Sequence, residues 1–447
     1  MDEQKNIQKS LLQSPRGTRD FYPELMVRQQ WLFDLWRTVS LRHGFEEYDG
    51  PIFEHLDLYQ IKSGDEIVSQ LFSFADRGGR NLALRPELTP TLARMVAAKA
   101  SSLPRPIKWF SIPRLCRAER PQRGRLREFF QWNIDIMGSG DVLADAECIF
   151  VALDFLRQIG LGPELVELRV NSRPIVAALL TDAGIGADRH EQFYAILDKF
   201  DKLPSEQFDA FAREQKVSQQ ELMSLKNMLN VPNLAALSDL ATSEDSQREL
   251  AKLQELHRDL ASFGVGDYFV YKPSVVRGLA YYTGIVFEIF DRSAKMRAIA
   301  GGGRYDNLIS MFGGPAMPAC GFGMGDVVLM DLLEDLGKIP SLTPHHPPEF
   351  FVIDAEAELF SLALKITGQL RKQNFVADYS PKRQAVGKQL KYADSRRALI
   401  VLILGSETRD QNLVTVKNLK TGKQLQIDLE RFLENPDQVR NDTADES

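Results

Sequence analysis

Residues 114–131 read RLCRAERPQRGRLREFFQ and form the densest cluster of charge in the chain. Between residues 114 and 127 there are six arginines and a single acid, Glu119. The segments PIKWFSIPRLCRAER and REFFQWNIDIMG read as strands, so we predict two paired strands around the loop PQRGR. Arginine forks bind phosphate and carboxylate oxygens in pairs. The stretch therefore indicates an anion-binding site; a solvated basic hairpin, or one that touches an RNA backbone, is the alternative.

Two carboxylates accompany these arginines. On the predicted strand, Arg117 and Glu119 point to the same face, which suits a ligand with both phosphate and amine character. Upstream, LRPELTP (84–90) places Glu87 in an apolar strand, with the Thr89 hydroxyl two residues on and on the same face. Glu87 is predicted to accept hydrogen bonds from an ammonium group; an ion pair with Arg85 or another arginine is the alternative.

Two further stretches carry chemistry near residue 300. VVRGLAYYTG (275–284) holds Arg277 between apolar residues and is followed by the alternating strand pattern IVFEIFD. An arginine there must reach solvent or meet a negative group. AGGGRYD (300–306) has three glycines, which permit close approach of a ligand, and Tyr305 offers a hydroxyl. It has the form of neither a phosphate loop nor a dinucleotide fingerprint.

Composition limits the class of protein. The 447 residues suffice for about three domains, and the net charge is −6, so any polyanion must be met by local patches. The three cysteines match no metal or disulfide spacing and favour a reducing, cytoplasmic setting. The sequence has no signal-peptide pattern and no apolar run long enough to cross a membrane, so no membrane association is expected.

Changes in pattern along the chain predict its organisation. Residues 1–14 and 435–447 are expected to be disordered tails, and the proline-rich segment 339–348 a linker. Strands and helices mix in residues 15–185 and 263–338. Residues 186–262 are almost entirely helical in pattern and are predicted to be an insertion. Residues 349–434 alternate strand and helix, which predicts a small α/β domain with a partly parallel sheet.

These motifs together resemble the class II aminoacyl-tRNA synthetases and, within that class, the histidyl-tRNA synthetase family. RGTRDFYP (16–23) resembles the family's opening, GFEEYDGPIFEH its motif 1, and CRAERPQRGRLREFFQ (116–131) its motif 2. RGLAYYTG and AGGGRYD resemble the two signatures of the histidine enzymes. The resemblance implies an α+β fold: an antiparallel sheet of six strands with flanking helices, a helical insertion, and a C-terminal α/β anticodon-binding domain.

The resemblance also implies an activity: histidine activated by ATP to histidyl-adenylate, then transferred to tRNA(His), with Mg²⁺ and a homodimer built on motif 1. Arg117 and Arg277 would be catalytic, one on each side of the α-phosphate. ATP would also contact Glu119 and Arg125. The histidine substrate would lie among Glu87, Thr89, Gln131, Asp135, Tyr281, Tyr282 and Tyr305. A basic stretch of the last domain would contact tRNA through Lys382, Arg383, Lys388 and Lys391. No metal ligands can be assigned.

The sequence departs from the family pattern at two positions. Ala280 stands where the histidine signature usually has an acid, and Val328 where motif 3 usually ends in an ATP-contacting arginine. Arg297 and Arg125 are the candidates to replace that charge. The alternatives to an active synthetase are a histidine-sensing paralogue, such as the regulatory subunit of ATP phosphoribosyltransferase, and an RNA-binding regulator built on an inactive synthetase. The paralogue typically lacks an anticodon domain and has an eroded motif 2.

Overall fold

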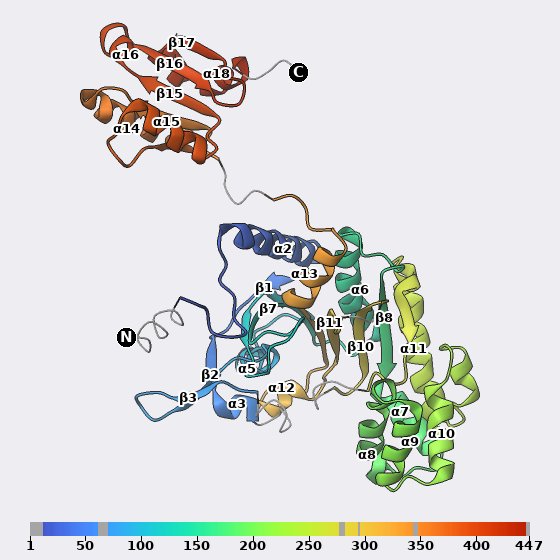
Figure 1. The fold of residues 1–447 in the computed structure, drawn as a ribbon. Helices are drawn as coiled ribbons and strands as arrows, with labels where there is room; N and C mark the ends of the chain where they lie inside the picture. Colours follow the sequence, from blue (N-terminus) through green and yellow to red (C-terminus); the bar gives the residue numbers. More distant parts are fainter. Residues whose placement is uncertain (1–11, 61–69, 277–281, 294–295, 343–346, 444–447) are drawn as a thin grey trace, which may run out of the picture. The chain divides into compact units, whose positions relative to one another are not determined.

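The computed structural model describes residues 12–60, 70–276, 282–293, 296–342 and 347–443. The chain forms two compact units, Met1–Ser341 and Leu342–Ser447 (Figure 1). The division falls within the predicted linker, 339–348. Residues 1–11 of the predicted N-terminal tail lie outside the described part of the chain.

A mostly antiparallel sheet is the centre of the first unit. Its order is β1-β5-β7-β12-β11-β10-β8-β9, and the six strands from β5 to β8 are antiparallel to their neighbours. The edge strands β1 and β9 pair in parallel, and β6 pairs with β7 outside this path. The bounds are β1 Glu46–Glu47, β5 Ile107–Ser111, β6 Arg114–Cys116, β7 Glu128–Met137, β8 Val166–Ser172, β9 Phe269–Tyr271, β10 Ile285–Asp291, β11 Ala300–Arg304 and β12 Ala319–Gly325. The predicted antiparallel sheet is confirmed; the described chain has six mutually antiparallel strands within a sheet of nine.

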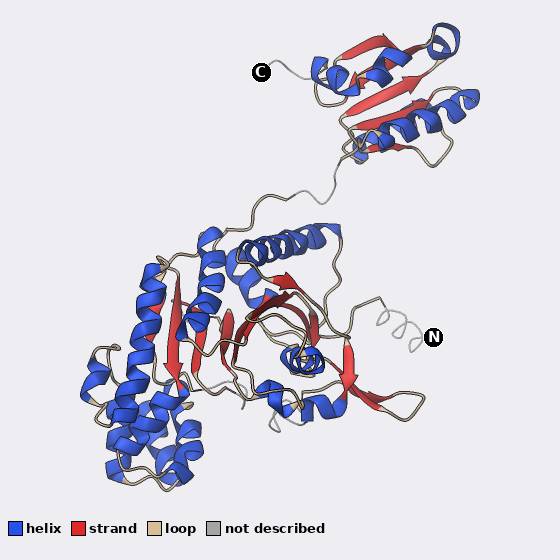
Figure 2. Cartoon of the chain, turned by 180° about the vertical axis from the view of Figure 1, so that it is seen from behind, coloured by secondary structure: helices blue, strands red, loops and turns tan. Residues whose placement is uncertain are grey.

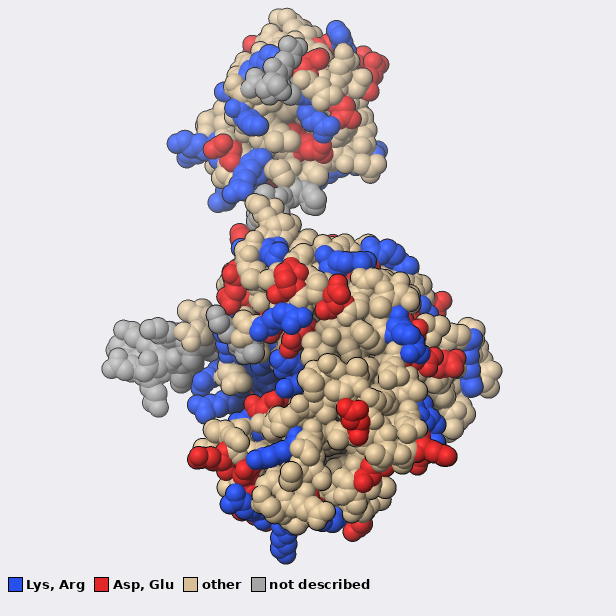
Figure 3. Space-filling view, turned by 90° about the vertical axis from the view of Figure 1, so that its right-hand side faces the viewer, with Lys and Arg blue, Asp and Glu red and all other residues tan. Residues whose placement is uncertain are grey.

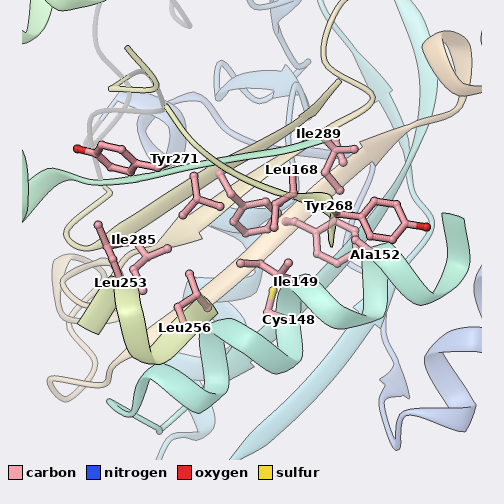
Figure 4. Close-up of a cluster of buried hydrophobic side chains, with 14 of the residues drawn as sticks. Cys148, Ile149, Ala152, Leu168, Leu253, Leu256, Tyr268, Tyr271, Ile285 and Ile289 are labelled. Carbon is pink, nitrogen blue, oxygen red and sulfur yellow. The ribbon is translucent and has the colours of Figure 1, made fainter. Parts of the chain in front are cut away.

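Helices cover one face of this sheet (Figure 2). They are α2 Pro23–Arg42, α6 Val142–Gln158, α11 Glu244–Ser262 and α13 Asp326–Asp335. Trp36 of α2 and Phe155 of α6 are fully buried and pack beside Trp132 of β7, with ring centroids 5.9 and 5.4 Å from that indole. Figure 4 shows the same core farther along, where Ile149 of α6 and Leu256 of α11 meet Leu168 of β8. This packing fixes the sheet and leaves its other face for ligands.

A second, smaller sheet lies near the N-terminus. Its order is β2-β4-β3, with β2 Phe53–His55, β3 Ser73–Ala75 and β4 Asn81–Leu84. β3 and β4 form a hairpin that turns at Gly79, whose φ of +78° suits glycine. Two short helices accompany it, α3 Leu56–Gln60 and α5 Thr89–Lys99, and α12 Leu308–Met311 packs against α5.

The helical insertion follows α7 Arg173–Asp182. In the described chain it consists of α8 His190–Leu197, α9 Ser205–Glu214, α10 Gln219–Leu229 and α11, with short 3₁₀ turns η1 Ala187–Arg189, η2 Phe200–Lys202 and η3 Ala236–Asp239 between them; η4 Gly266–Tyr268 then leads into β9. Capping boxes at Ser218 and Ser243 begin α10 and α11.

The second unit contains a five-stranded sheet of order β14-β13-β15-β16-β17. The first three strands are parallel, and helices α14 and α15 connect them, as βαβ crossovers require. The bounds are β13 Phe350–Asp354, η5 Ala357–Leu359, α14 Phe360–Lys372, β14 Ala377–Tyr379, α15 Val386–Ser395, β15 Ile400–Leu404, α16 Ser406–Gln411, β16 Leu413–Asn418, β17 Gln424–Asp428, α17 Leu429–Glu434 and α18 Pro436–Asp442. The predicted α/β domain is confirmed.

One fold prediction is wrong. The stretch 435–447 was expected to be a disordered tail, yet Pro436–Asp442 form helix α18. The Asn435 side chain accepts a hydrogen bond from the Gln438 amide, and Val439 is buried in the core of the unit. A cap and one apolar anchor order a segment whose composition is otherwise polar. No helix within the described residues is long and apolar enough to cross a membrane.

Candidate active site

The uncovered face of the central sheet carries a row of polar side chains on β7. Gln131, Asn133 and Asp135 alternate with Trp132 and Ile134, which are buried on the helix-covered face. Because side chains of a strand alternate between faces, the three polar groups project together. Asn133 was not predicted from the sequence, although the same alternation from Gln131 to Asp135 would have found it.

Glycines on the neighbouring strands leave space beside this row. Gly321 pairs with Asp135 and Gly323 with Asn133. A Cβ at Gly321 would lie 2.3 Å from Asp135 Oδ1, and a Cβ at Gly323 would lie 2.5 Å from Gln131 Nε2. On β11, a Cβ at Gly303 would lie 3.1 Å from the Tyr282 ring. Any side chain at these positions would occupy the volume that a ligand needs.

The space is a cavity of about 80 Å³. Its lining includes Glu87, Thr89, Arg117, Gln131, Asn133, Asp135, Tyr282 and Tyr305. Of the seven residues predicted to hold histidine, six therefore line one cavity; Tyr281 lies outside the described residues.

The local structure around Glu87 differs from the prediction. Strand β4 ends at Leu84 and helix α5 begins at Thr89, so Glu87 and Thr89 lie in a corner between a strand and a helix rather than on one strand face. The turn of the chain still brings both to the cavity. The alternative ion pair of Glu87 with Arg85 is not formed, because Arg85 pairs with Asp49 at 2.5 Å and donates to the Gly50 carbonyl oxygen at 2.8 Å.

Asp135 and Tyr305 form the polar end of this cavity. The Tyr305 hydroxyl donates a hydrogen bond to Asp135 Oδ1. Burial raises the pKa of Asp135 to about 7, and the Tyr305 hydrogen bond opposes that rise only in part. Burial, together with the negative charges of Glu87 and Asp135, also raises the pKa of Tyr282, so its hydroxyl stays protonated. The cavity thus contains both donors and a carboxyl group whose charge is sensitive to a ligand.

A buried ion pair positions Tyr305. Its neighbour Arg304 donates to Asp145 of α6 at 3.1 Å and to the Ser139 carbonyl oxygen at 3.0 Å. Asp306 accepts from Arg304 at 3.3 Å and from the Ala319 amide at 3.1 Å. Tyr305 is held between two residues whose side chains are fixed to the scaffold, which limits the positions its hydroxyl can occupy.

The arginine-rich loop borders a second, larger cavity of about 510 Å³. Its lining includes Arg117, Glu119, Arg125, Glu288 and Arg297. Arg117 and Glu119 were predicted to share a strand face, but β6 ends at Cys116 and both residues lie in the loop. The loop is closed by a backbone hydrogen bond between Arg117 and Arg127, and Glu119 accepts a hydrogen bond from Arg125.

The first segment of the chain supports this loop. Gly17 adopts a φ of +89° and its carbonyl oxygen accepts from the Arg127 amide at 2.8 Å. Arg19 binds the buried Asp326 at 2.7 Å, and Asp326 also accepts from the Phe130 amide at 3.0 Å. These contacts join residues 17–19, β7 and α13 around the larger cavity.

Arg117 lies where the two cavities meet. It lines both, together with Gln131, Tyr282, Gly301 and Gly323. Its Nε donates to the Pro86 carbonyl oxygen at 2.9 Å, and its guanidinium lies 5.1 Å from the centre of the Phe129 ring. A cation held in this way can contact ligands in both cavities at once. Arg277 and Ala280 lie outside the described residues.

Comparison with known proteins decides the family. A family profile for histidyl-tRNA synthetase matches residues 17–326, and one for the anticodon binding domain matches residues 349–435. The chain belongs to the histidyl-tRNA synthetase family. The resemblance read from the motifs is thereby confirmed.

Individual relatives of the histidyl-tRNA synthetase family extend over nearly the whole chain. The histidine–tRNA ligase of Opitutus terrae is 39% identical over 94% of this chain and 96% of its own length. The chloroplastic/mitochondrial histidine–tRNA ligase of Arabidopsis thaliana is 39% identical over 93% of this chain and 85% of its own length.

Solved structures share the fold. The histidyl-tRNA synthetase of Nostoc sp. PCC 7120 matches with a TM-score of 0.75 at 23% identity, covering 95% of this chain and 99% of that one. An ATP phosphoribosyltransferase regulatory subunit/histidyl-tRNA synthetase of Bacillus halodurans matches with a TM-score of 0.73 at 23% identity, covering 88% and 99%. At this identity the two structures support the fold alone.

The residues predicted to bind tRNA lie in the second unit. Lys382 and Arg383 lie between β14 and α15, and Lys388 and Lys391 lie on α15; all four are exposed. Arg383 is also bound within the unit, since it donates to the Ala357 carbonyl oxygen at 3.0 Å and lies 3.4 Å from Asp354. On the face drawn in Figure 3, Lys and Arg are interspersed with Asp and Glu.

Proposed function

We propose that this protein is a histidine–tRNA ligase, which activates L-histidine with ATP and transfers the histidyl group to tRNA(His). Family membership and the ligase relatives support the activity. The observation that carries the chemistry is the pair of adjoining cavities with Arg117 at their junction. Histidine would occupy the smaller cavity and ATP the larger one.

The first step joins the histidine carboxylate to the α-phosphorus of ATP, and pyrophosphate leaves. Negative charge gathers on the phosphoryl oxygens, so a cation fixed beside them lowers the barrier. Arg117 is held by Pro86 and Phe129 at the junction, where the carboxylate and the α-phosphate would meet. Arg277 is proposed, from the sequence signature, to act on the same phosphate from the other side.

Histidine would be selected by hydrogen bonds at both ends. Asp135 and the Tyr305 hydroxyl would contact the imidazole, with Gln131 on the same strand face, while Glu87 and Thr89 would hold the ammonium group. A site built around buried polar groups rejects analogues that leave those groups unpaired, by about 10⁴-fold in comparable cases. The small volume of this cavity would further exclude larger side chains.

Mg²⁺ would accompany ATP. Mg²⁺ in nucleotide sites is usually held by one or two carboxylates plus the substrate phosphates. Glu119 and Glu288 line the larger cavity, and no group of three or more potential metal ligands occurs among the described residues. The residues therefore fit a metal bound jointly with the triphosphate, where it would neutralise phosphate charge; Glu288 and Glu119 are the side chains that would hold it.

The second unit would bind the anticodon arm of tRNA(His). Its profile match and the exposed basic residues around α15 support this role, because phosphate contacts supply most non-specific affinity for nucleic acid. We also propose a cytoplasmic location, which agrees with three buried, unpaired cysteines.

A homodimer is proposed through the motif 1 region. β2 and β3 expose neighbouring aromatic side chains, Phe53 at 47% and Phe74 at 44%, whose ring centroids are 6.2 Å apart. Exposed apolar clusters of this kind mark interaction surfaces.

Histidine-dependent exchange of pyrophosphate into ATP tests the proposed function. A ligase should catalyse exchange with L-histidine and not with other amino acids, and should attach histidine to tRNA(His). A histidine-sensing paralogue or an RNA-binding regulator would bind a ligand without exchange. The arginine loop and the anticodon-binding match favour the ligase over the histidine-sensing paralogue.

A further inference from the structure

The larger cavity lacks a cation at the end of motif 3. Val328 occupies that position on α13; its side chain is buried, lines the cavity and lies close to the loop, since a Cβ at Gly124 would be 3.3 Å from Val328 Cγ2. Valine cannot bind phosphate oxygens. If ATP binds here, as the proposed function requires, another residue must meet the charge of its outer phosphates.

Among the described residues, three arginines line this cavity, and two of them already have other partners. Arg125 is bound to the Glu119 carboxylate. Arg117 is fixed to the Pro86 carbonyl oxygen at the junction with the smaller cavity. Its position suits the α-phosphate, which must lie next to the histidine carboxylate. A different cation is therefore needed for the β- and γ-phosphates.

Arg297 is the third. Its side chain is exposed, lines the larger cavity but not the smaller one, and makes no ion pair with any residue in the described part of the chain. The backbone on either side is anchored: the Met296 amide donates to the buried Asp291 at 3.2 Å, and the Ile299 amide donates to the Ile289 carbonyl oxygen at 2.8 Å. The guanidinium thus projects from a fixed base into the space for ATP.

We propose that Arg297 binds the outer phosphates of ATP and supplies the charge that Val328 does not. Its planar fork can contact two phosphate oxygens at once. The proposal rests on the proposed function for the identity of the nucleotide, and it separates the roles of the arginines: Arg117 at the α-phosphate, Arg297 at the phosphates beyond it. Arg125 serves to fix the loop.

Equilibrium binding of a non-hydrolysable ATP analogue and of AMP, without histidine or tRNA, tests this role. Arg297→Ala should lower the affinity for the ATP analogue by about 10- to 100-fold, because the outer phosphates lose a charged hydrogen bond. The affinity for AMP, which has no outer phosphates, should stay within about twofold of the wild-type value. Arg297→Lys keeps the charge without the planar fork, so it should lose less affinity for the ATP analogue than Arg297→Ala does. Arg120→Ala removes an exposed arginine that is not part of the cavity lining, and should leave both ligands unchanged.

The outcome depends on the ratio of the affinity for the ATP analogue to the affinity for AMP. The assignment is overturned if Arg297→Ala leaves that ratio at its wild-type value, if it weakens both ligands equally, or if wild-type protein does not prefer the triphosphate. Pyrophosphate exchange is measured separately with histidine present. Absence of exchange in the wild type would refute the proposed function without changing the affinity ratio.

Discussion

The environment of Asp135 opposes the ionisation of its carboxyl group. Its carboxyl group is buried, and its pKa of about 7 compares with an unperturbed value of 3.8. At neutral pH the folded protein holds a carboxyl close to half ionisation, which costs stability relative to a neutral side chain. The position makes sense if the group exists to bind a ligand with a donor of its own.

Asp135→Asn should therefore stabilise the protein at high pH while impairing histidine binding. In the unfolded chain the carboxyl ionises near pH 4, whereas in the folded chain it stays protonated to about pH 7, so stability falls across that interval in the wild type and not in the variant. The asparagine oxygen can still accept from Tyr305. Thermal unfolding should show similar free energies of unfolding for the wild type and the variant at pH 4. At pH 8 the variant should be more stable than the wild type by up to about 4 kcal/mol.

The wild-type melting temperature must converge with that of the variant as pH falls. A difference in melting temperature between the two proteins that stays constant from pH 4 to pH 8 would contradict the raised pKa of Asp135. Unchanged histidine affinity in the variant would contradict its place in the substrate pocket.

At the scale of elements, the glycine strands β11 and β12 give the pocket its volume. Gly321→Ala should weaken histidine binding by about tenfold or more, because the new Cβ would lie 2.3 Å from Asp135 Oδ1 and displace it. Gly325→Ala is the matched control on the same strand, since a Cβ there would meet no atom within 4 Å. Titration of histidine into both variants, with circular dichroism to verify folding, makes the comparison.

If both alanine variants bind histidine as the wild type does, the pocket does not lie against β12. A loss of folded structure in Gly321→Ala alone would be distinguished by its spectrum. Gly323→Ala then provides a second test, because its Cβ would lie 2.5 Å from Gln131 Nε2, the end of a side chain that can move while the backbone stays in place.

How far the sequence predicts the structure also depends on the element. The strand pattern of REFFQWNIDIMG predicted β7 correctly, and the family resemblance supplied Gln131 and Asp135 as candidates on it. The sequence pattern could not place the corner at Glu87 and Thr89, because these residues also fit a strand. The chain turns there because helix α5 begins at Thr89 and is held by tertiary contacts. The end of β6 was missed for a similar reason: the hydrogen bonds that close the loop after Cys116 come from residues distant in sequence.

The site shows the same limits. The motifs identified six of seven histidine-binding candidates within one cavity because each motif carries unusual residue types at fixed spacing. They did not identify Asn133, which is an ordinary polar residue, and they could not choose between Arg125 and Arg297. The proposal of Arg297 rests on the ion pair between Arg125 and Glu119, which links residues on two sides of a turn.

At the scale of the whole molecule, the aromatic cluster on β2 and β3 predicts self-association. Phe53 and Phe74 are exposed at nearly half their surface, and burying them in a symmetric interface would remove apolar area from water. Light scattering at micromolar concentration should give twice the chain mass of 50.6 kDa. Phe53→Asp should shift the protein toward the chain mass, whereas Met223→Asp, at an exposed residue of the helical insertion, should not. A wild-type monomer would contradict the motif 1 assignment.

The central claim is that Arg117, and Arg277 with it, neutralises one phosphate beside a bound histidine. Histidine-dependent ATP–pyrophosphate exchange on the wild type, Arg117→Ala and Arg277→Ala measures this most directly. The account predicts exchange in the wild type and a loss of about 10³-fold in each variant, because a preorganised charge on the reacting phosphate is removed. No exchange in the wild type, or equal rates in all three proteins, would contradict it.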